Sequence, residues 1–380
     1  MSLHPVVGHE GLLSSMARAH ERTSLPSSLL LHGPRGVGKQ RVALWIAQLT
    51  ICERPAAEGP CEKCGACRMA LKLEHPDVHW YFPLARPKGV AGDRLVTALE
   101  DARMQGLEDL RAEPLYASHT ADVRGLYFGI TRTIRRQAHL RPNMAAGQVF
   151  IIGNAELLVP QEASPEAANA LLKLLEEPPG TSRFILTSSE PGRLLPTILS
   201  RTVALHVTPL STDSIDNFLN EHTDADREIT KWACKLSRGS IGRALGFLPD
   251  GEEEGPLESL RHQALALIEV AVVQDPGQGY ELSLSYPSAG ARALIPLCAF
   301  IEEWLRDLGA IVSGAGDRVF NFDKHSHLQE LVARTSIRGP DIVLALTEVE
   351  QARELARGNV NPQLIVNGLV RNLRRRLIAT

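Results

Sequence analysis

Apolar residues in the first half of the chain fall into short runs that alternate with longer stretches of helical spacing. The runs cover residues 28–32, 149–152, 184–186 and 203–207, and their length and aliphatic content are typical of buried parallel strands. Helical spacing follows at 39–50 and at 164–178, where Ser164 suits the N-cap and Pro165 the first helical position. Strands that alternate with helices predict an α/β fold with a parallel sheet covered on both faces.

The pattern changes after Pro209, where the strand-like runs give way to helical spacing alone. An acidic stretch at 249–256, flanked by glycine and proline, is typical of a linker. We therefore expect three domains. The core spans 1–208 and includes an extended insertion of mixed pattern at about 83–147, a small helical domain spans 209–248, and an all-helical domain spans 257–380.

The composition limits the class of protein. Hydrophobic residues make up 44% and charged residues 22% of the 380 residues, as in ordinary soluble proteins of several domains. A net charge of -3 gives no overall attraction to nucleic acid. No run reaches the ~18 apolar residues of a membrane helix, and the N-terminal residues lack the pattern of a signal peptide. We expect a cytoplasmic protein with no membrane partner.

Residues 33–40 read Gly-Pro-Arg-Gly-Val-Gly-Lys-Gln and match the spacing of a phosphate-binding P-loop up to the lysine. The loop lies between a predicted strand and a predicted helix, where backbone N–H groups can hold phosphate. The candidate nucleotide-binding residues are Gly33, Gly36, Gly38, Lys39 and Gln40. Gln40 replaces the Ser or Thr whose hydroxyl holds magnesium. The P-loop is therefore degenerate.

Four of the six cysteines, Cys52, Cys61, Cys64 and Cys67, lie in one short segment with the spacing C-x8-C-x2-C-x2-C. Thiolates two residues apart can bind one tetrahedral ion, and four thiolates close its coordination shell. We therefore predict a structural zinc site within a zinc module at about 52–67. Free thiols in a loop are the alternative, and a disulfide is disfavoured in a reducing cytoplasm.

The P-loop, the cysteine spacing and two further strings resemble the clamp-loader family of bacterial DNA polymerase III. The strings are Ala167-Ala-Asn-Ala-Leu-Leu-Lys-Leu-Leu-Glu-Glu-Pro-Pro179 and Pro196-Thr-Ile-Leu-Ser-Arg201. The resemblance implies a RecA-like AAA+ core with an inserted zinc module, a helical lid and an all-α C-terminal collar that holds a ring of subunits together. It also implies partners: the motor ATPase and delta subunits, the sliding clamp and, through the assembled complex, primed DNA.

The resemblance further implies where catalytic residues of an active member would stand. A strand should end in Asp-Glu, with the Asp organising magnesium and the Glu activating water. Gly153 and Asn154 stand at those positions here, and Glu156 follows two residues late. Hydrolysis by this chain is therefore not expected. Lys39 could still hold phosphate, so ATP or ADP binding that is weak or absent stays open, beside a P-loop kept only for folding.

Arg201 stands where the resemblance implies an arginine finger, which stabilises transition-state charge at nucleotide bound on a neighbouring subunit. Its alternative role is a surface or interface salt bridge. Arg243 is similar to the lid arginine that senses nucleotide, and its alternative role is a domain-docking contact. Ser188 lies near the position of a polar sensor residue.

Three functions fit these observations. The leading one is a non-hydrolysing subunit of the DNA polymerase III holoenzyme that scaffolds the loader ring and donates Arg201 to a neighbouring ATPase as the clamp is loaded in replication. The second is an active motor ATPase of the same family, which Gln40, Gly153 and Asn154 disfavour. The third is a zinc-dependent DNA-binding protein, which the net charge disfavours. Arginines at 132–141 and 371–376 suit either phosphate contacts or packed and solvated helix faces.

Overall fold

The computed structural model describes residues 3–115, 124–158, 166–272, 276–335, 337–358 and 360–378. These divide into two compact units. The first contains the described residues up to 245, and the second contains those from 246 onward. The expected N-cap at Ser164 and Pro165 lies outside the described residues, and the three predicted domain boundaries remain predictions.

The first unit is built on a five-stranded sheet in which all neighbouring strands are parallel. In spatial order the strands are β2 (Val78–Tyr81), β5 (Val149–Ile152), β6 (Arg183–Ser188), β1 (Ser28–His32) and β7 (Val203–His206). The central strand β6 pairs β1 with Leu30 opposite Leu186. This arrangement confirms the predicted α/β fold class, and it brings the ends of β1, β5 and β6 to one edge of the sheet.

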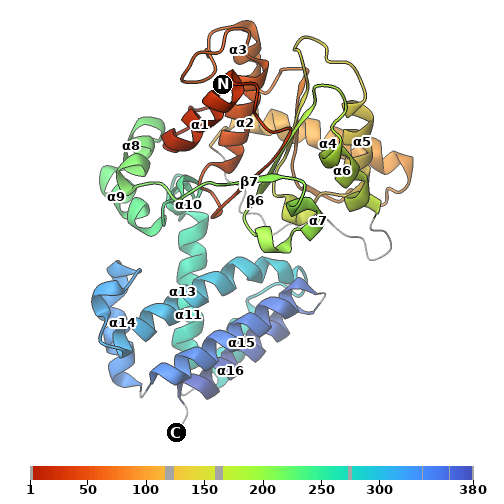
Figure 1. Ribbon diagram of the computed structural model, residues 1–380. Helices are drawn as coiled ribbons and strands as arrows, with labels where there is room; N and C mark the ends of the chain where they lie inside the picture. Colours follow the sequence, from red (N-terminus) through yellow and green to blue (C-terminus); the bar gives the residue numbers. More distant parts are fainter. Residues whose placement is uncertain are drawn as a thin grey trace. The chain divides into compact units, whose positions relative to one another are not determined.

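Alternate residues of the central strands enter two separate hydrophobic clusters, one on each face of the sheet. Leu29 and Leu31 belong to one cluster, which also contains residues of α1 (Glu10–Glu21), α2 (Lys39–Ile51) and α3 (Gly65–Leu71). Leu30 belongs to the other cluster, with residues of α5 (Phe128–Ala138), α6 (Glu166–Glu176) and α7 (Pro196–Leu199). Figure 1 shows the sheet between these two groups of helices. Because both faces are covered, the strands can be apolar throughout.

The insertion at about 83–147 contains a long helix, α4 (Asp93–Ala112), followed by α5. Two short antiparallel strands, β3 (Leu84–Ala85) and β4 (Arg124–Gly125), flank α4 in the sequence. On α5, Ile130, Ile134 and Ala138 are buried, whereas three arginines on the opposite side are exposed. The mixed sequence pattern therefore corresponds to two amphipathic helices that pack against each other and against the edge of the sheet.

The helical segment after the sheet contains α8 (Thr212–His222), α9 (Arg227–Leu236) and the start of α10 (Ile241–Phe247). Ser211 caps α8 by accepting a hydrogen bond from Ser214 N, and Asp226 caps α9 by accepting one from Glu228 N. Side-chain oxygens at these positions satisfy backbone donors that have no partner within the helix. The segment is attached to the sheet domain through Leu210 N, which donates to Gly239 O.

The second unit is helical throughout its described residues, as the sequence predicts. Its α-helices are α11 (Pro256–Val272), α12 (Pro276–Leu284), α13 (Leu294–Val312), α14 (His325–Arg334), α15 (Gly339–Arg357) and α16 (Pro362–Leu377). Helix α13 packs against α11 and α15 and buries an apolar stripe: Leu294, Leu297, Ile301 and Leu305. No helix in the described parts of the chain is long and apolar enough to cross a membrane.

A buried arginine ties three segments of this second unit together. Arg261 is 0% exposed, and its guanidinium donates to Glu258 at 2.8 Å and to Asn321 at 2.7 Å. The guanidinium also lies 5.0 Å from the ring centroid of Trp304, whose Nε1 donates to Arg261 O. A fully buried charge is tolerated because it is paired and hydrogen-bonded. These partners are structural, so we assign Arg261 to folding.

Candidate functional site

The P-loop connects the end of β1 to the start of α2 and depends on glycine at two close contacts. Gly33 has a φ of 150°, and a Cβ there would lie 2.2 Å from Val207 O. Gly36 has a φ of 78°, and a Cβ there would lie 2.3 Å from Ser240 Oγ. Larger residues would collide with neighbouring backbone or side chains and would also be strained. The loop geometry expected from the glycine spacing is therefore present.

The side chain of the P-loop lysine is hydrogen-bonded to the loop backbone and to a nearby serine. Lys39 Nζ donates to Gly33 O at 2.9 Å, to Pro34 O at 2.6 Å and to Ser189 Oγ at 3.0 Å. The residue is only 5% exposed. Burial lowers its pKa to about 8, an effect that the nearby carboxylate of Glu156 partly opposes. Phosphate binding would require Lys39 to exchange these partners for phosphate oxygens.

An amide pair occupies the place where the resemblance implies magnesium and the catalytic base. Gln40 Nε2 lies 3.4 Å from Asn154 Oδ1, although the two residues are 114 positions apart. Gly153 provides the necessary space, since a Cβ there would lie 2.9 Å from Gln40 Nε2. The sequence-predicted substitutions are thus brought together in space. Neutral amides supply neither a carboxylate ligand for a cation nor a base for water.

Thr187 and Ser189, which the sequence reasoning did not single out, complete this site together with Glu156. Thr187 Oγ1 accepts a hydrogen bond from Asn154 N at 3.0 Å, and Ser189 Oγ accepts one from Lys39. Glu156 Oε1 in turn accepts a hydrogen bond from Ser189 N at 3.1 Å. Ser188 is fully buried, and its Oγ instead accepts a hydrogen bond from Glu190 N. The sensor role suggested for Ser188 stays a prediction.

The backbone of the segment around α10 contacts the P-loop directly. Gly242 N donates to Gly36 O at 3.1 Å, and the Cα of Gly242 would lie 3.3 Å from a Cβ on Gly36. The backbone N–H of Arg243, the candidate lid sensor, donates a hydrogen bond to Ser240 Oγ at 3.0 Å. Its side-chain Nε donates to Leu236 O at 3.0 Å. Its backbone therefore lies beside the P-loop while Nε binds within the lid. The nucleotide-sensing role remains a prediction.

Arg201 follows α7 at the surface of the first unit. Its Nε donates to Glu176 Oε2 at 3.0 Å, and its Nη1 donates to Thr197 O at 3.1 Å. The Arg201 side chain is 31% exposed and that of Glu176 is 56% exposed. Large apolar side chains are exposed on the adjoining residues, namely Leu195, Leu199 and Val203. An accessible arginine beside exposed leucines and valine is consistent with a protein–protein interface.

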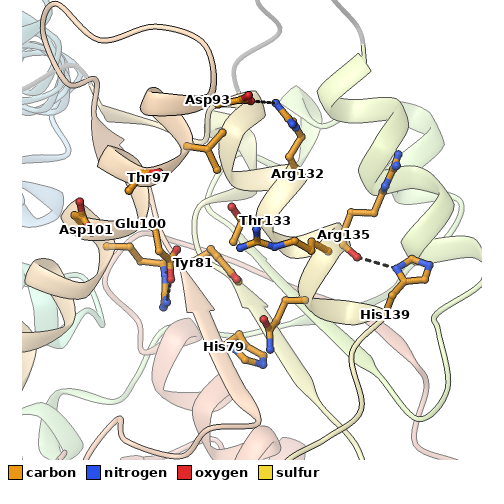
Figure 2. Close-up of a pocket in the computed structure, with 14 residues that line it drawn as sticks. His79, Tyr81, Asp93, Thr97, Glu100, Asp101, Arg132, Thr133, Arg135 and His139 are labelled. Carbon is orange, nitrogen blue, oxygen red and sulfur yellow. Dashed lines mark hydrogen bonds and ion pairs between the residues drawn. The ribbon is translucent and has the colours of Figure 1, made fainter.

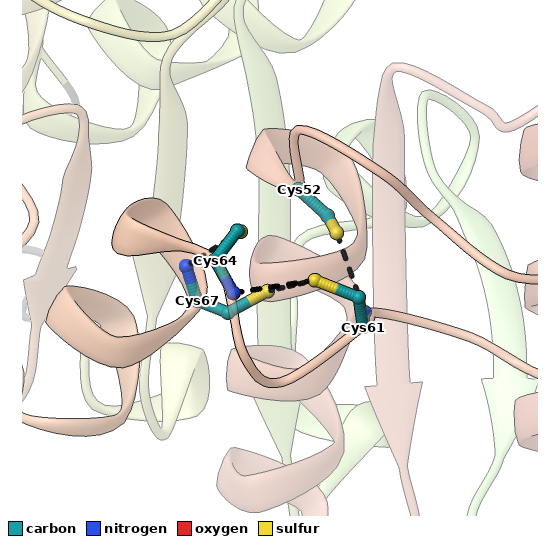
Figure 3. A group of neighbouring side chains, drawn as sticks. All are labelled: Cys52, Cys61, Cys64 and Cys67. Atoms are coloured by element: carbon teal, nitrogen blue, oxygen red, sulfur yellow. Dashed lines mark hydrogen bonds between the residues drawn. The ribbon is translucent and has the colours of Figure 1, made fainter.

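The four cysteines of the predicted zinc module converge in space, as Figure 3 shows. Cys52 follows the end of α2, Cys64 caps α3, and Cys67 lies within α3. Their Sγ atoms all lie within 4.8 Å of one another, and those of Cys61 and Cys67 are 4.0 Å apart. Four sulfurs at about 2.3 Å from a zinc ion would be about 3.8 Å from each other. The donor set therefore fits a structural zinc ion.

Backbone N–H groups support negative charge on this cluster. Cys61 N points to Cys52 Sγ at 3.3 Å, Cys64 N to Cys61 Sγ at 3.4 Å, and Cys67 N to Cys64 Sγ at 3.4 Å. The N–H groups of Lys63 and Cys64 lower the pKa of Cys61 to about 6. Thiolates are the form that binds metal. Within the same cluster, burial raises the pKa of Cys52 and Cys67. Cys234 and Cys298 lie outside the cluster and are buried singly, and burial raises the pKa of each to about 11.

A cavity of about 1280 Å³ lies between α4 and α5 beside the edge strand β2 (Figure 2). It includes the arginines singled out at 132–136, but acidic residues face them. Arg132 binds Asp93 at 3.1 Å, and Arg103 donates to Glu100 at 2.9 Å. Burial and Arg103 lower the pKa of His79 to about 4, so this histidine is neutral at pH 7. Because the charges are nearly balanced, we assign no ligand to this cavity.

The second arginine cluster, near the C-terminus, makes contacts within the second unit. Arg376 donates to Glu348 Oε1 at 2.8 Å, and Asn372 also donates to Glu348 at 2.8 Å. Glu348 is only 5% exposed, so these bonds join α15 to α16 in a partly buried contact. At least Arg376 is thus used for packing between two helices of this chain. The roles expected of the cluster, subunit packing or phosphate contact, stay predictions.

The chain is similar to subunits of DNA polymerase III. The profile of the family described as DNA polymerase III, delta subunit matches residues 8–211, more than half of the chain. DNA polymerase III subunit delta' of Pseudomonas aeruginosa is 36% identical over 175 residues, which cover 46% of this chain and 40% of that protein. The subunit delta' of Bacillus subtilis is 29% identical over 201 residues, covering 53% and 48%.

Similarity also extends to a subunit of a different name. DNA polymerase III subunit tau of Bacillus subtilis is 26% identical over 224 residues, which cover 58% of this chain and 32% of that protein. The chain thus spans about half the length, or less, of the relatives it matches.

Proposed function

The chain belongs to the DNA polymerase III, delta subunit family, and from this premise we propose that it is a delta'-type clamp-loader subunit that does not hydrolyse nucleotide. In this role it scaffolds the loader ring and donates Arg201 to nucleotide bound by a neighbouring ATPase. Its partners are the motor ATPase and delta subunits, with the sliding clamp and primed DNA engaged by the assembled complex. We expect it to work in the cytoplasm.

The observation that carries the proposal is the amide pair of Gln40 and Asn154. The pair lies 3.4 Å apart beside Gly153, where an active member needs a hydroxyl, a magnesium-binding carboxylate and a base. Removing the base alone costs about 10²–10⁴-fold in rate. With all three groups changed, turnover on this chain's own P-loop would lack both metal binding and water activation.

The surroundings of Arg201 support the second half of the proposal. Among the residues that the structure describes, its guanidinium has one carboxylate partner, Glu176, which is itself more than half exposed. A positively charged group of this kind can be redirected to a phosphate at little cost, because exposed ion pairs contribute only about 0–1 kcal/mol. In comparable phosphoryl-transfer proteins, an arginine supplied by a neighbour raises turnover by about 10³–10⁵-fold. The chemistry would therefore take place on the partner subunit.

Two cofactors enter the proposal differently. Zinc would be held by Cys52, Cys61, Cys64 and Cys67, and would fix the end of α2 against α3 without taking part in catalysis. ATP or ADP would bind weakly or not at all, because Lys39 already has three oxygen partners. A nucleotide phosphate would have to replace these partners of Lys39.

The test is ATP turnover by the assembled loader, in a complex where only the ATPase adjoining this chain keeps its own P-loop lysine. We expect Arg201→Ala to lower turnover by about 10³-fold or more, with assembly confirmed by gel filtration. Arg193→Ala is the matched control, because Arg193 is a nearby exposed arginine paired with Glu190. Unchanged turnover in the intact Arg201→Ala complex would reject the trans-acting role.

Turnover by the isolated chain tests the alternative, an active motor ATPase. We expect no ATP hydrolysis above that of a Lys39→Ala control. Hydrolysis that depends on magnesium and disappears with Lys39→Ala would instead establish an active P-loop, since both groups act on the nucleotide phosphates.

A further inference from the structure

Glu176 joins two strings that are far apart in the sequence but adjacent in the fold. It is the last residue of α6, and Arg201 comes just after α7. The carboxylate accepts a hydrogen bond from Arg201 Nε at 3.0 Å. On the same guanidinium, Nη1 donates to Thr197 O at 3.1 Å and lies 3.5 Å from Ser200 Oγ. The head group is therefore held at two of its three nitrogens.

The third nitrogen is left available. Among the residues that the structure describes, no hydrogen-bond partner of Arg201 Nη2 is present. A guanidinium carries five N–H donors in a rigid plane, so fixing Nε and Nη1 also fixes the direction of the remaining donors. An arginine anchored in this way can offer Nη2 to a phosphate oxygen without first losing the freedom of a long side chain.

Stability does not explain the pair. Both side chains are substantially exposed, and exposed ion pairs contribute little to the stability of a fold. The adjacent Glu177 is also exposed, yet no hydrogen bond or ion pair of its side chain is present among the described residues. The contact is thus specific to Glu176 rather than a general effect of two acidic residues at the end of α6.

We propose that Glu176 is the positioning residue for Arg201. Its carboxylate holds Nε so that the free guanidinium N–H groups meet the phosphates of nucleotide bound to the neighbouring subunit. This inference rests on the proposed function, in which Arg201 acts in trans. Glu176 touches neither nucleotide nor reacting atoms in this scheme, and its effect on turnover passes entirely through Arg201.

The experiment uses the same assembled loader, in which only the adjoining ATPase turns over. Glu176→Ala is expected to lower kcat by roughly tenfold, since misplacing a group in an active site costs up to about 10²-fold. The KM for ATP should stay unchanged, because the ground-state contacts belong to the partner. Glu176→Gln keeps an oxygen that can accept from Nε and should recover most of the activity. Glu177→Ala is the matched control and should equal wild type.

A double-mutant cycle decides whether the effect passes through Arg201. Adding Glu176→Ala to Arg201→Ala should cause no further loss of turnover. An equal loss in both backgrounds would mean that Glu176 acts independently, and a rise in turnover would mean that its carboxylate competes with phosphate; either result overturns the proposal. A large effect of Arg201→Ala with no effect of Glu176→Ala would overturn it while leaving the proposed function intact. No effect of either would reject both.

Discussion

The P-loop and the surface around Arg201 lie in the same unit, but their charged side chains differ in burial and in the number of hydrogen-bond partners. Lys39 is 5% exposed and has three oxygen partners from its own surroundings. The Arg201 side chain is 31% exposed and, in the described part of the chain, pairs with one surface carboxylate, that of Glu176. Lys39, Gln40 and Asn154 are hydrogen-bonded to groups of this chain, whereas Glu156 Oε2 and Trp80 Nε1 beside them are buried without a partner among the described residues. The surface around Arg201 has exposed hydrogen-bond donors and exposed apolar side chains, as an interface requires.

Under the proposed function, this difference separates a site that has lost its chemistry from a residue that has retained it. A site that has lost its ligand still has buried polar groups, and these must find partners inside the protein. Gln40 and Asn154 have done so. A residue that acts on another subunit is under no such constraint, because its partner arrives on assembly. The predictions below test this contrast, beginning with a third site on the same helix as the P-loop.

The largest effect should come from removing metal from the far end of α2, where a ligand is required. Cys61→Ser combined with Cys64→Ser should abolish zinc binding and lower the free energy of unfolding by several kcal/mol, since a structural zinc ion can contribute ~10 kcal/mol. Metal content and denaturant unfolding measure this. Cys234→Ala, a cysteine outside the cluster, should retain one zinc per chain. Purified protein that contains far less than one zinc ion per chain would contradict the predicted zinc site.

A substitution in the P-loop should cost more stability than one near Arg201, although less than loss of zinc. Gly33→Ala places a Cβ 2.2 Å from Val207 O, and we expect it to lower the free energy of unfolding by roughly 3 kcal/mol. Gly192 lies near Arg201, in the short 3₁₀ turn Pro191–Arg193, with nothing within 4 Å of a Cβ. Gly192→Ala should cost less than about 0.5 kcal/mol. Equal urea midpoints for the two variants would contradict a tightly closed P-loop.

Lys39 should give the chain a pH dependence that Arg201 does not. Its pKa is about 8 in the folded chain against 10.5 as the ordinary value. Between these values the unfolded state binds more protons, so stability should rise with pH, by about 1–3 kcal/mol in total. Lys39→Met should remove this rise, whereas Arg201→Met should retain it. Parallel profiles for wild type and Lys39→Met would show that the lysine is not buried in the closed loop.

Much of the sheet and the metal site could be predicted because the signals are local. Strands β1, β5, β6 and β7 correspond to short apolar runs, and the cysteine ligands lie within sixteen residues of each other. Strand β2 was missed because its sequence, Val78-His-Trp-Tyr81, is short and contains a polar residue at the sheet edge. Helices α4 and α5 were obscured by their many charges, since each buries only one face.

The contacts that define the two sites could not be predicted, because they join residues distant in sequence. Gln40 meets Asn154 across 114 positions, Lys39 meets Ser189 across 150, and Arg201 meets Glu176 across 25. The sequence placed Ser188 near the position of a polar sensor residue, and that role stays a prediction. Adjacent residues point to opposite sides at a strand end, so the hydroxyl that reaches Lys39 belongs to Ser189.

The central claim is that the P-loop of this chain does not hydrolyse nucleotide, whereas Arg201 promotes hydrolysis on the neighbouring subunit. The most direct test compares Lys39→Ala and Arg201→Ala in the assembled loader, under conditions where only the adjoining ATPase turns over. We predict that the Lys39→Ala complex matches wild type, whereas the Arg201→Ala complex loses about 10³-fold or more in turnover. Loss of turnover with Lys39→Ala and full activity with Arg201→Ala, both in intact complexes, would contradict the account.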